Sequence, residues 1–429
     1  MDSAPERRKA DFMPVEVRTQ RQLELLQASL NRACKTVDYY ARKFTAACVS
    51  PGDVAGLSDL SRLPFTVRRD LAEHYPYGLF AVPLRDIVRI HTAPGMGANP
   101  TVTGYTKNDL LSWREITARA LSAAGLTAND IVQIFLDPGL ANWGRDYKDG
   151  AEFLEASVIP LTALAMEKQI SVLRDYRVTA LITCASLAER MLSALRASGA
   201  GPDLALKTLI LVGEPVPPED RARLSGENGL STWIHYGLSE VPGPAIAFEC
   251  PAHQGMHLAE DHFYAEVVDP ETGEPVKAGD PGELCLTTLT TRAFPLVRFR
   301  TGDRVREVPG ACSCGRTFKR IEWLSGRTDH SVILRGVKVS REQVFFHMER
   351  ALGFLPKGLR LAKGRQADDD GLVVLVGVDD DLFSDEIKEL ESVMRKAAAV
   401  LRQELGIPVK VRLTEAMEEN RDDPWIAET

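Results

Sequence analysis

The chain has 429 residues, of which 44% are hydrophobic and 26% are charged, and this composition excludes a largely disordered protein. Its net charge is -8, and its 52 lysines and arginines are spread along the chain, so a nucleic-acid-binding surface is not indicated. A single hydrophobic core rarely serves a chain of this length, and two or more domains are expected.

The first ninety residues predict a helical cap on a larger core. Residues 21–44 place apolar side chains every three to four positions, a spacing typical of amphipathic helices, and a loop-rich stretch follows. Residues 1–20 mix charges of both signs and have no apolar run long enough for a signal peptide or a membrane span. We therefore expect a cytoplasmic protein that binds neither nucleic acid nor membrane.

Between Asp86 and about Val216, short β-rich runs alternate with helical stretches. The runs are residues 87–91, 131–136, 157–161, 179–184 and 208–214. This alternation predicts parallel βαβ units in an α/β sheet. Ligands of such sheets bind where the strands end in polar or glycine-rich loops.

The pattern changes after His235. Residues 263–276 and 282–290 read as hairpin strands, which predicts an antiparallel β region. After Asp329 the order is βαββαβ-like and about a hundred residues long, enough for a separate domain. We predict an α/β protein: a large N-terminal domain (1–328, with 1–90 as the cap) and a small, mobile α+β C-terminal domain (329–429).

Seven segments, taken in order, resemble the phenylacetate-coenzyme A ligase family of adenylate-forming enzymes. They are residues 63–83, 91–106, 212–219, 234–250, 286–303, 312–317 and 325–340. The resemblance implies an AMP-forming ligase that converts an aryl or other small carboxylic acid and ATP to an acyl-adenylate, and then to a coenzyme A thioester. The C-terminal domain would rotate between the two steps. It also implies Mg²⁺ as a cofactor and a possible homodimer.

The segment Tyr236-Gly237-Leu238-Ser239-Glu240 follows an apolar run, so it leaves a strand facing the expected cleft. In relatives the matching aromatic residue stacks on adenine, the hydroxyl position meets phosphate, and the glutamate helps to hold Mg²⁺, which favours carboxylate oxygen. The alternative is a glycine turn with a surface glutamate.

Three further positions match the family's nucleotide site. Asp303 ends a β segment and would accept hydrogen bonds from ribose hydroxyls, although a turn aspartate beside glycine is the alternative. Arg327 would approach the nucleotide at the domain junction, next to the hinge at Asp329, or form a structural salt bridge. The stretch Gly213-Glu214-Pro215 would line the adenine pocket through its backbone.

Three cysteines and one histidine form a candidate zinc site. Cys312 and Cys314 share a short turn, and Cys250 and His257 lie upstream, a donor set that suits tetrahedral zinc. Relatives carry a comparable set. Four protein ligands leave no open position, so the role would be structural. The spacing does not decide between His257 and His253.

Two motifs depart from the family pattern. In the phosphate loop, residues 91–100, Pro94 and Met96 replace hydroxyl residues and Asn99 stands at the lysine position. Three lost bonds at ~1.5 kcal/mol each would weaken phosphate binding by ~4.5 kcal/mol, roughly a thousandfold. No lysine follows Lys410, so Arg421 is the candidate for the C-terminal positive charge.

Three functions therefore stay open. The first is the carboxylate ligase, with coenzyme A or an amine as acceptor. The second is a non-adenylating homologue that binds a nucleotide, an acyl ligand or a protein partner. A zinc hydrolase is the third, and it would need an open metal position beside a general base.

Overall fold

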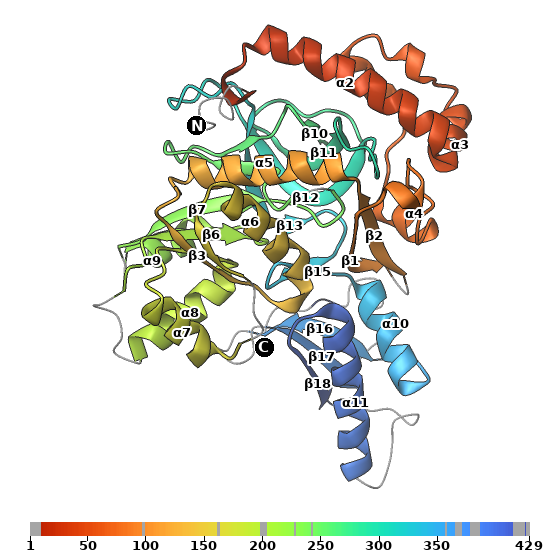
Figure 1. Cartoon of the computed structure of the whole chain (residues 1–429). Coiled ribbons are helices and arrows are strands. Elements are labelled where there is room, and N and C mark those ends of the chain that lie inside the picture. Colours follow the sequence, from red (N-terminus) through yellow and green to blue (C-terminus); the bar gives the residue numbers. More distant parts are fainter. Residues whose placement is uncertain are drawn as a thin grey trace.

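A computed structural model of the chain describes residues 10–96, 99–160, 164–197, 204–226, 229–241, 243–356, 358–364, 371–377, 387–414 and 425 (Figure 1). The cap helices and the C-terminal elements lie at opposite ends of the molecule, with a large sheet between them. No helix among these residues is long and apolar enough to cross a membrane.

The cap begins with two helices, as the helical spacing over residues 21–44 predicts. Helix α2 (Val15–Thr36) ends where Val37 takes an extended conformation, and α3 (Asp38–Ala46) follows at once. The buried face of α2 includes Leu26, Leu30 and Ala33, at the expected helical spacing. The other cap helices are α4 (Arg68–Glu73) and 3-10 turns at Ala10–Phe12, Pro51–Asp53, Leu57–Arg62 and Leu84–Asp86.

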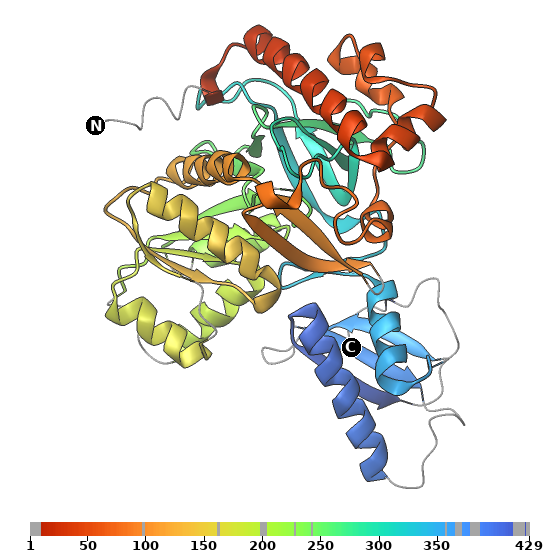
Figure 2. The same ribbon diagram turned by 45° about the vertical axis from the view of Figure 1, so that its right-hand side comes forward.

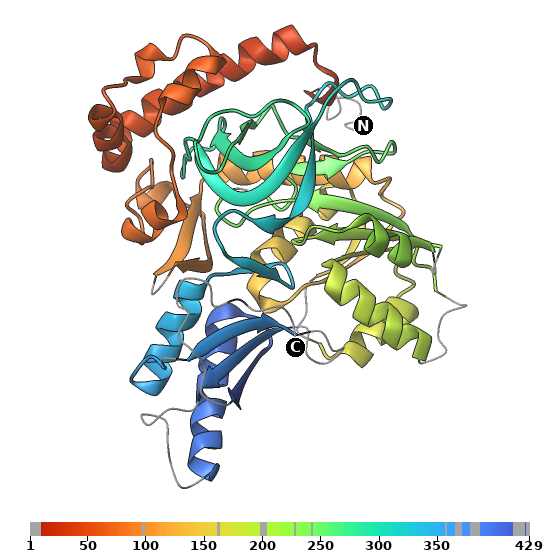
Figure 3. The same cartoon turned by 180° about the vertical axis from the view of Figure 1, so that it is seen from behind.

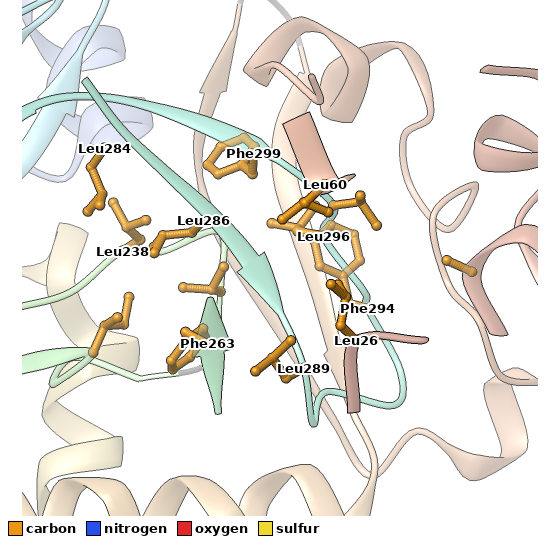
Figure 4. Close-up of a cluster of buried hydrophobic side chains, with 14 of the residues drawn as sticks. Leu26, Leu60, Leu238, Phe263, Leu284, Leu286, Leu289, Phe294, Leu296 and Phe299 are labelled. Carbon is orange, nitrogen blue, oxygen red and sulfur yellow. The ribbon is translucent and has the colours of Figure 1, made fainter. Parts of the chain in front are cut away.

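The cap packs on the antiparallel part of the sheet. Gln22 Nε2 of α2 donates to the carbonyl oxygen of Glu260 at 2.8 Å, and Ser29 Oγ donates to that of Thr288 at 3.0 Å. Apolar side chains from both sides, including Leu26, Leu60 and Phe294, fill the space between them (Figure 4). This packing buries the hydrophobic face of α2.

The described strands of the main sheet run in the order β10-β11-β12-β13-β9-β8-β7-β6-β5-β3-β4. Strands β3 to β7 pair in parallel, and the pairs from β7 to β10 are antiparallel, so both predicted regions are confirmed. The strands are Ile131–Phe135 (β3), Ser157–Ile159 (β4), Ala180–Thr183 (β5), Thr208–Val212 (β6), Ser231–Tyr236 (β7), Ala247–Glu249 (β8), Met256–Leu258 (β9), Phe263–Val268 (β10), Pro281–Thr288 (β11), Phe299–Val308 (β12) and Arg320–Arg327 (β13).

Helices cover the parallel half of this sheet (Figure 3). They are Lys107–Ala123 (α5), Ala141–Phe153 (α6), Met166–Asp175 (α7), Ala185–Ala197 (α8) and Pro218–Gly226 (α9), with a 3-10 turn at Pro138–Leu140. Every residue of β5 is buried, as expected for a parallel strand that is covered on both faces.

The run at residues 87–91 was wrongly predicted to join the parallel sheet. It begins strand β1 (Arg89–Met96), which pairs antiparallel with β2 (Asn99–Tyr105) in a separate hairpin (Figure 2). A parallel crossover needs about a dozen residues or more, and the connection between β1 and β2 has room only for a hairpin.

The C-terminal elements follow the predicted order, but the first β unit is a hairpin. Strands β14 (Val332–Leu334) and β15 (Val337–Val339) pair with each other, apart from the sheet β16-β17-β18. The remaining elements are Arg341–Leu352 (α10), Leu359–Lys363 (β16), Leu372–Gly377 (β17), Ile387–Leu405 (α11) and Val409–Thr414 (β18). The hairpin places β15 against the main body.

Candidate functional site

A pocket lies between the carboxyl ends of the parallel strands and the β14–β15 hairpin. Four predicted residues line it: Gly213, Gly237, Ser239 and Glu240. The other described lining residues come from the cap, β1, the 138–143 region, the loop after β7, β13 and the hairpin: Arg68, Ala93, Gly139, Leu140, Trp143, Leu238, Trp323, Gly336, Val337 and Lys338. Segments up to 270 positions apart thus meet at the edge where ligands of α/β sheets bind.

Tyr236 and Asp303 lie directly behind the pocket wall. The Tyr236 hydroxyl donates to Asp303 Oδ2 at 2.8 Å, and the ring packs edge-to-face on Trp323 with centroids 4.8 Å apart. Tyr236 is fully buried, so the aromatic rings that line the pocket are those of Trp143 and Trp323. The sequence motif pointed to Tyr236 as the aromatic residue of the site, and it did not point to Trp143 or Trp323.

Two buried carboxylates and three cations meet at this wall. Glu240 Oε1 lies 3.2 Å from Arg68 Nε, and Glu240 Oε2 lies 3.9 Å from Lys338 Nζ. Asp303 pairs with Arg327 through one oxygen and lies 3.3 Å from Lys338 Nζ through the other. Burial alone would raise the pKa of Glu240, but the nearby Lys338 and Arg68 hold it below its usual value. Glu240 is therefore charged at neutral pH.

Arg327 forms salt bridges with Asp303 and with Asp329, the first residue of the C-terminal part. Its guanidinium group contacts both oxygens of Asp329, at 2.9 and 2.6 Å, and donates to the Thr301 carbonyl oxygen at 2.8 Å. Asp303 and Asp329 raise the pKa of Arg327 despite its burial, so it stays positively charged.

Of the predicted stretch Gly213-Glu214-Pro215, Gly213 lines the pocket, whereas the side chain of Glu214 joins two other segments. It accepts hydrogen bonds from Ser186 N and Oγ, at 3.0 and 2.9 Å, and from Gly336 N of the hairpin at 3.2 Å. Gly213 and Gly336 both have positive φ, and a Cβ on Gly213 would lie 2.8 Å from Gly336 Cα. This close approach requires glycine and brings the hairpin onto the pocket. Pro215 follows and is half-buried.

A second, smaller pocket adjoins the first and shares its wall at Gly139, Trp143, Leu238 and Ser239. Its floor is polar: His91, Asn142 and Asp146 line it together with Tyr105, Trp113 and Val241. Burial, with Arg89 nearby, lowers the pKa of His91 to about 3, so its imidazole is neutral.

Asp146, which lines this pocket, makes the stability of the protein depend on pH. Burial raises its pKa to about 8 from 3.8, although Arg89 Nη1, 3.1 Å away, opposes the rise. Between these values the folded state keeps the proton that the unfolded state has lost, so the free energy of unfolding falls as pH rises from about 4 to 8.

We expect Asp146→Asn to make the free energy of unfolding, measured by urea titration, fall less between pH 4 and 8. Parallel pH profiles for the variant and the wild type would contradict it.

The four predicted metal ligands converge. The ligand atoms of Cys250, His257, Cys312 and Cys314 all lie within 4.8 Å of one another. Cys250 Sγ and Cys312 Sγ are 3.6 Å apart, and Cys314 Sγ lies 3.4 Å from His257 Nε2. Zinc bonds of about 2.3 Å to sulfur and 2.0 Å to nitrogen give tetrahedral edges of about 3.5–3.8 Å, so the spacing suits zinc.

The second coordination shell favours His257 over His253. His257 Nδ1 lies 3.1 Å from the Phe318 carbonyl oxygen, which leaves Nε2 free to bind a metal. His253 lies elsewhere: its Nδ1 contacts Arg221 Nη2 at 2.6 Å, and its ring packs on Trp233.

The departures from the family pattern are only partly within the described residues. Asn99 Nδ2 donates to the Ala72 carbonyl oxygen at 3.0 Å, which ties the loop to α4. Residues 97–98 and Arg421 lie outside the described residues, as do the side chains of Pro94 and Met96.

The chain is similar to several known proteins. Residues 155–291 match the family model "AMP-binding enzyme". The phenylacetate-coenzyme A ligase of Thermus thermophilus is 36% identical over 420 residues, 94% of each chain. A 2-hydroxyisobutyryl-CoA ligase in complex with 2-HIB-AMP and CoA in the thioesterification state has a TM-score of 0.91 at 23% identity, covering 100% of this chain and 94% of that one. The same ligase in its postadenylation state, with 2-HIB-AMP and the same identity and coverage, scores 0.73.

Proposed function

The chain belongs to the phenylacetate-coenzyme A ligase family of adenylate-forming enzymes, and we propose that it joins a small carboxylic acid to coenzyme A through an acyl-adenylate. The observation that carries the proposal is the pocket where Gly213, Gly237, Ser239 and Glu240 meet the β14–β15 hairpin. The relatives support the ligase over a non-adenylating homologue.

We assign roles by position. Trp323 would meet the base, Asp303 the ribose, and Ser239 the phosphate, while Tyr236 holds Asp303 in place. Glu240 is an ionised carboxylate that suits Mg²⁺, which would neutralise phosphate charge during adenylation. Arg327 lies at the junction between the proposed domains 1–328 and 329–429, with Asp329 at the hinge.

We assign the acid to the smaller pocket, which opens onto the nucleotide pocket at Ser239. Coenzyme A carries phosphates, and a third pocket, between the cap and the hairpin side, is lined by Arg68, Arg69 and Arg300. The carboxylates Glu283, Asp329 and Glu342 line the same pocket. Arg68 lines both this groove and the nucleotide pocket, so a thiol entering from the groove would reach the acyl group.

Acid-dependent pyrophosphate release with magnesium-ATP tests this proposal. We expect turnover with one class of small aryl or hydroxylated acid, followed by thioester formation when coenzyme A is added. Absence of pyrophosphate with every acid in a broad panel, despite nucleotide binding, would favour the non-adenylating alternative.

We also propose that Cys250, His257, Cys312 and Cys314 hold a structural zinc ion. All four positions would be filled by protein, which argues against a zinc hydrolase. The loop that carries Cys312 and Cys314 also anchors the chain start, because Arg316 Nε lies 2.9 Å from the buried Asp11.

Replacing Cys312 by serine should remove the zinc and lower the melting temperature by about 5 °C. Elemental analysis should find one zinc per wild-type chain and a large loss in the variant. Cys48→Ser, at an exposed cysteine, is the control and should keep both properties. Equal zinc contents in the wild type and Cys312→Ser would rule the site out.

A further inference from the structure

Lys338 is a charged side chain of the nucleotide pocket to which the sequence analysis assigned no role. It lies in β15, and its Nζ atom is buried 3.3 Å from Asp303 Oδ2 and 3.9 Å from Glu240 Oε2. The ammonium group makes no hydrogen bond to any residue in the described part of the chain. Because Lys338 also lines the pocket, its ammonium has N–H groups to donate to a ligand bound there.

The neighbouring carboxylates already have closer cations. Glu240 pairs with Arg68 at 3.2 Å, and Asp303 pairs with Arg327. Burying an ammonium without a hydrogen-bond acceptor is costly, even near negative charge. The Lys338 ammonium is therefore placed to donate hydrogen bonds to an anionic group that enters the pocket beside Ser239.

We propose that Lys338 is a catalytic residue of the second half-reaction, in which its ammonium group binds the phosphate of the departing AMP. This inference rests on the ligase function proposed above. The coenzyme A sulfur forms a bond to the acyl carbon, the bond from that carbon to the phosphate oxygen breaks, and AMP leaves with the electron pair. The thiol proton passes to solvent. The phosphate gains one negative charge in this step, and Lys338 offsets it.

The position of Lys338 ties this role to the second step. It lies beyond Asp329, the proposed hinge, so its presence in the pocket depends on how the C-terminal part packs. In the described arrangement Glu214 and Gly213 hold the hairpin turn at Gly336. The higher TM-score to the thioesterification state than to the postadenylation state supports the same assignment. Adenylation, with the hairpin elsewhere, would not use Lys338.

AMP binding to the full-length protein tests the contact without any acid. Calorimetry should show that Lys338→Met weakens AMP binding about tenfold or more, that Lys338→Arg retains part of the affinity, and that Lys396→Met has no effect. Lys396 is exposed on α11 of the same C-terminal part and serves as the matched control. Equal AMP affinity in Lys338→Met and the wild type, or no AMP binding to the wild type, would overturn the proposal.

A single-turnover experiment then separates the two half-reactions. With the acid that supports pyrophosphate release, Lys338→Met should slow thioester formation from the preformed adenylate about 100-fold, and slow adenylate formation much less. Equal slowing of both steps would show a structural role and overturn the proposal. If instead the proposed ligase function is wrong, the wild-type protein will release no pyrophosphate with any acid.

Discussion

Glu240→Gln should lower acid-dependent pyrophosphate release about 100-fold while the protein stays folded. Glutamine keeps the shape of the side chain but removes the negative charge that we assign to Mg²⁺ and that faces Arg68 and Lys338. A neutral amide is a poorer ligand for a hard cation than a carboxylate. The assay is initial-rate pyrophosphate release at saturating magnesium-ATP and acid.

Glu266→Gln is the matched control for this variant. Glu266 is also a buried glutamate paired with an arginine, Arg298, at 3.0 Å, but it lies in β10, away from the pocket. It should keep most of the activity. Comparable losses in the two variants would mean that general damage to the fold, not the site, explains the result.

Asp303→Ala should lower the free energy of unfolding by about 3–5 kcal/mol, because it leaves two buried cations short of a counter-charge. Asp303 is fully buried, and it contacts Arg327, Lys338 and the Tyr236 hydroxyl. Asp329 still pairs with Arg327 in the variant, so Lys338 bears most of the loss. Urea unfolding at pH 7 measures the change.

Two further variants bracket the expected loss. Asp303→Asn keeps a hydrogen-bond acceptor and should cost less than the alanine variant. Asp280→Ala removes an exposed aspartate of a turn and should change stability by less than about 0.5 kcal/mol. If Asp303→Ala were no more harmful than Asp280→Ala, the charge cluster would not be a stabilising unit.

The parallel strands and the loop residues were predictable because both signals are local. A buried run such as β6, Thr208–Val212, reads directly from its apolar residues, and Gly213 follows it in the chain. Glu240 was found in the same way, four residues after the end of β7. The convergence of Cys250, His257, Cys312 and Cys314 was also predicted, because cysteine and histidine are among the few residue types that bind zinc.

The contacts between distant segments were not predictable. Arg68 and Lys338 both reach Glu240, yet they are 270 positions apart, and no local pattern marks either as a partner. Likewise, the role of Glu214 became visible only when the fold brought Gly336 next to it. The strand β1 was misassigned because its own residues suit a strand, whereas its pairing partner is decided by the length of the connection.

The packing of α2 on β10 and β11 has a consequence for how the protein is made. The helix leaves the ribosome well before its partner strands, because Ser29 hydrogen-bonds to Thr288, 259 positions later. At a synthesis rate of about 5–20 residues per second, the apolar face of α2 stays exposed for roughly 10–50 s before its partner strands are made. During that interval the nascent chain presents a free amphipathic helix, the kind of surface that chaperones bind.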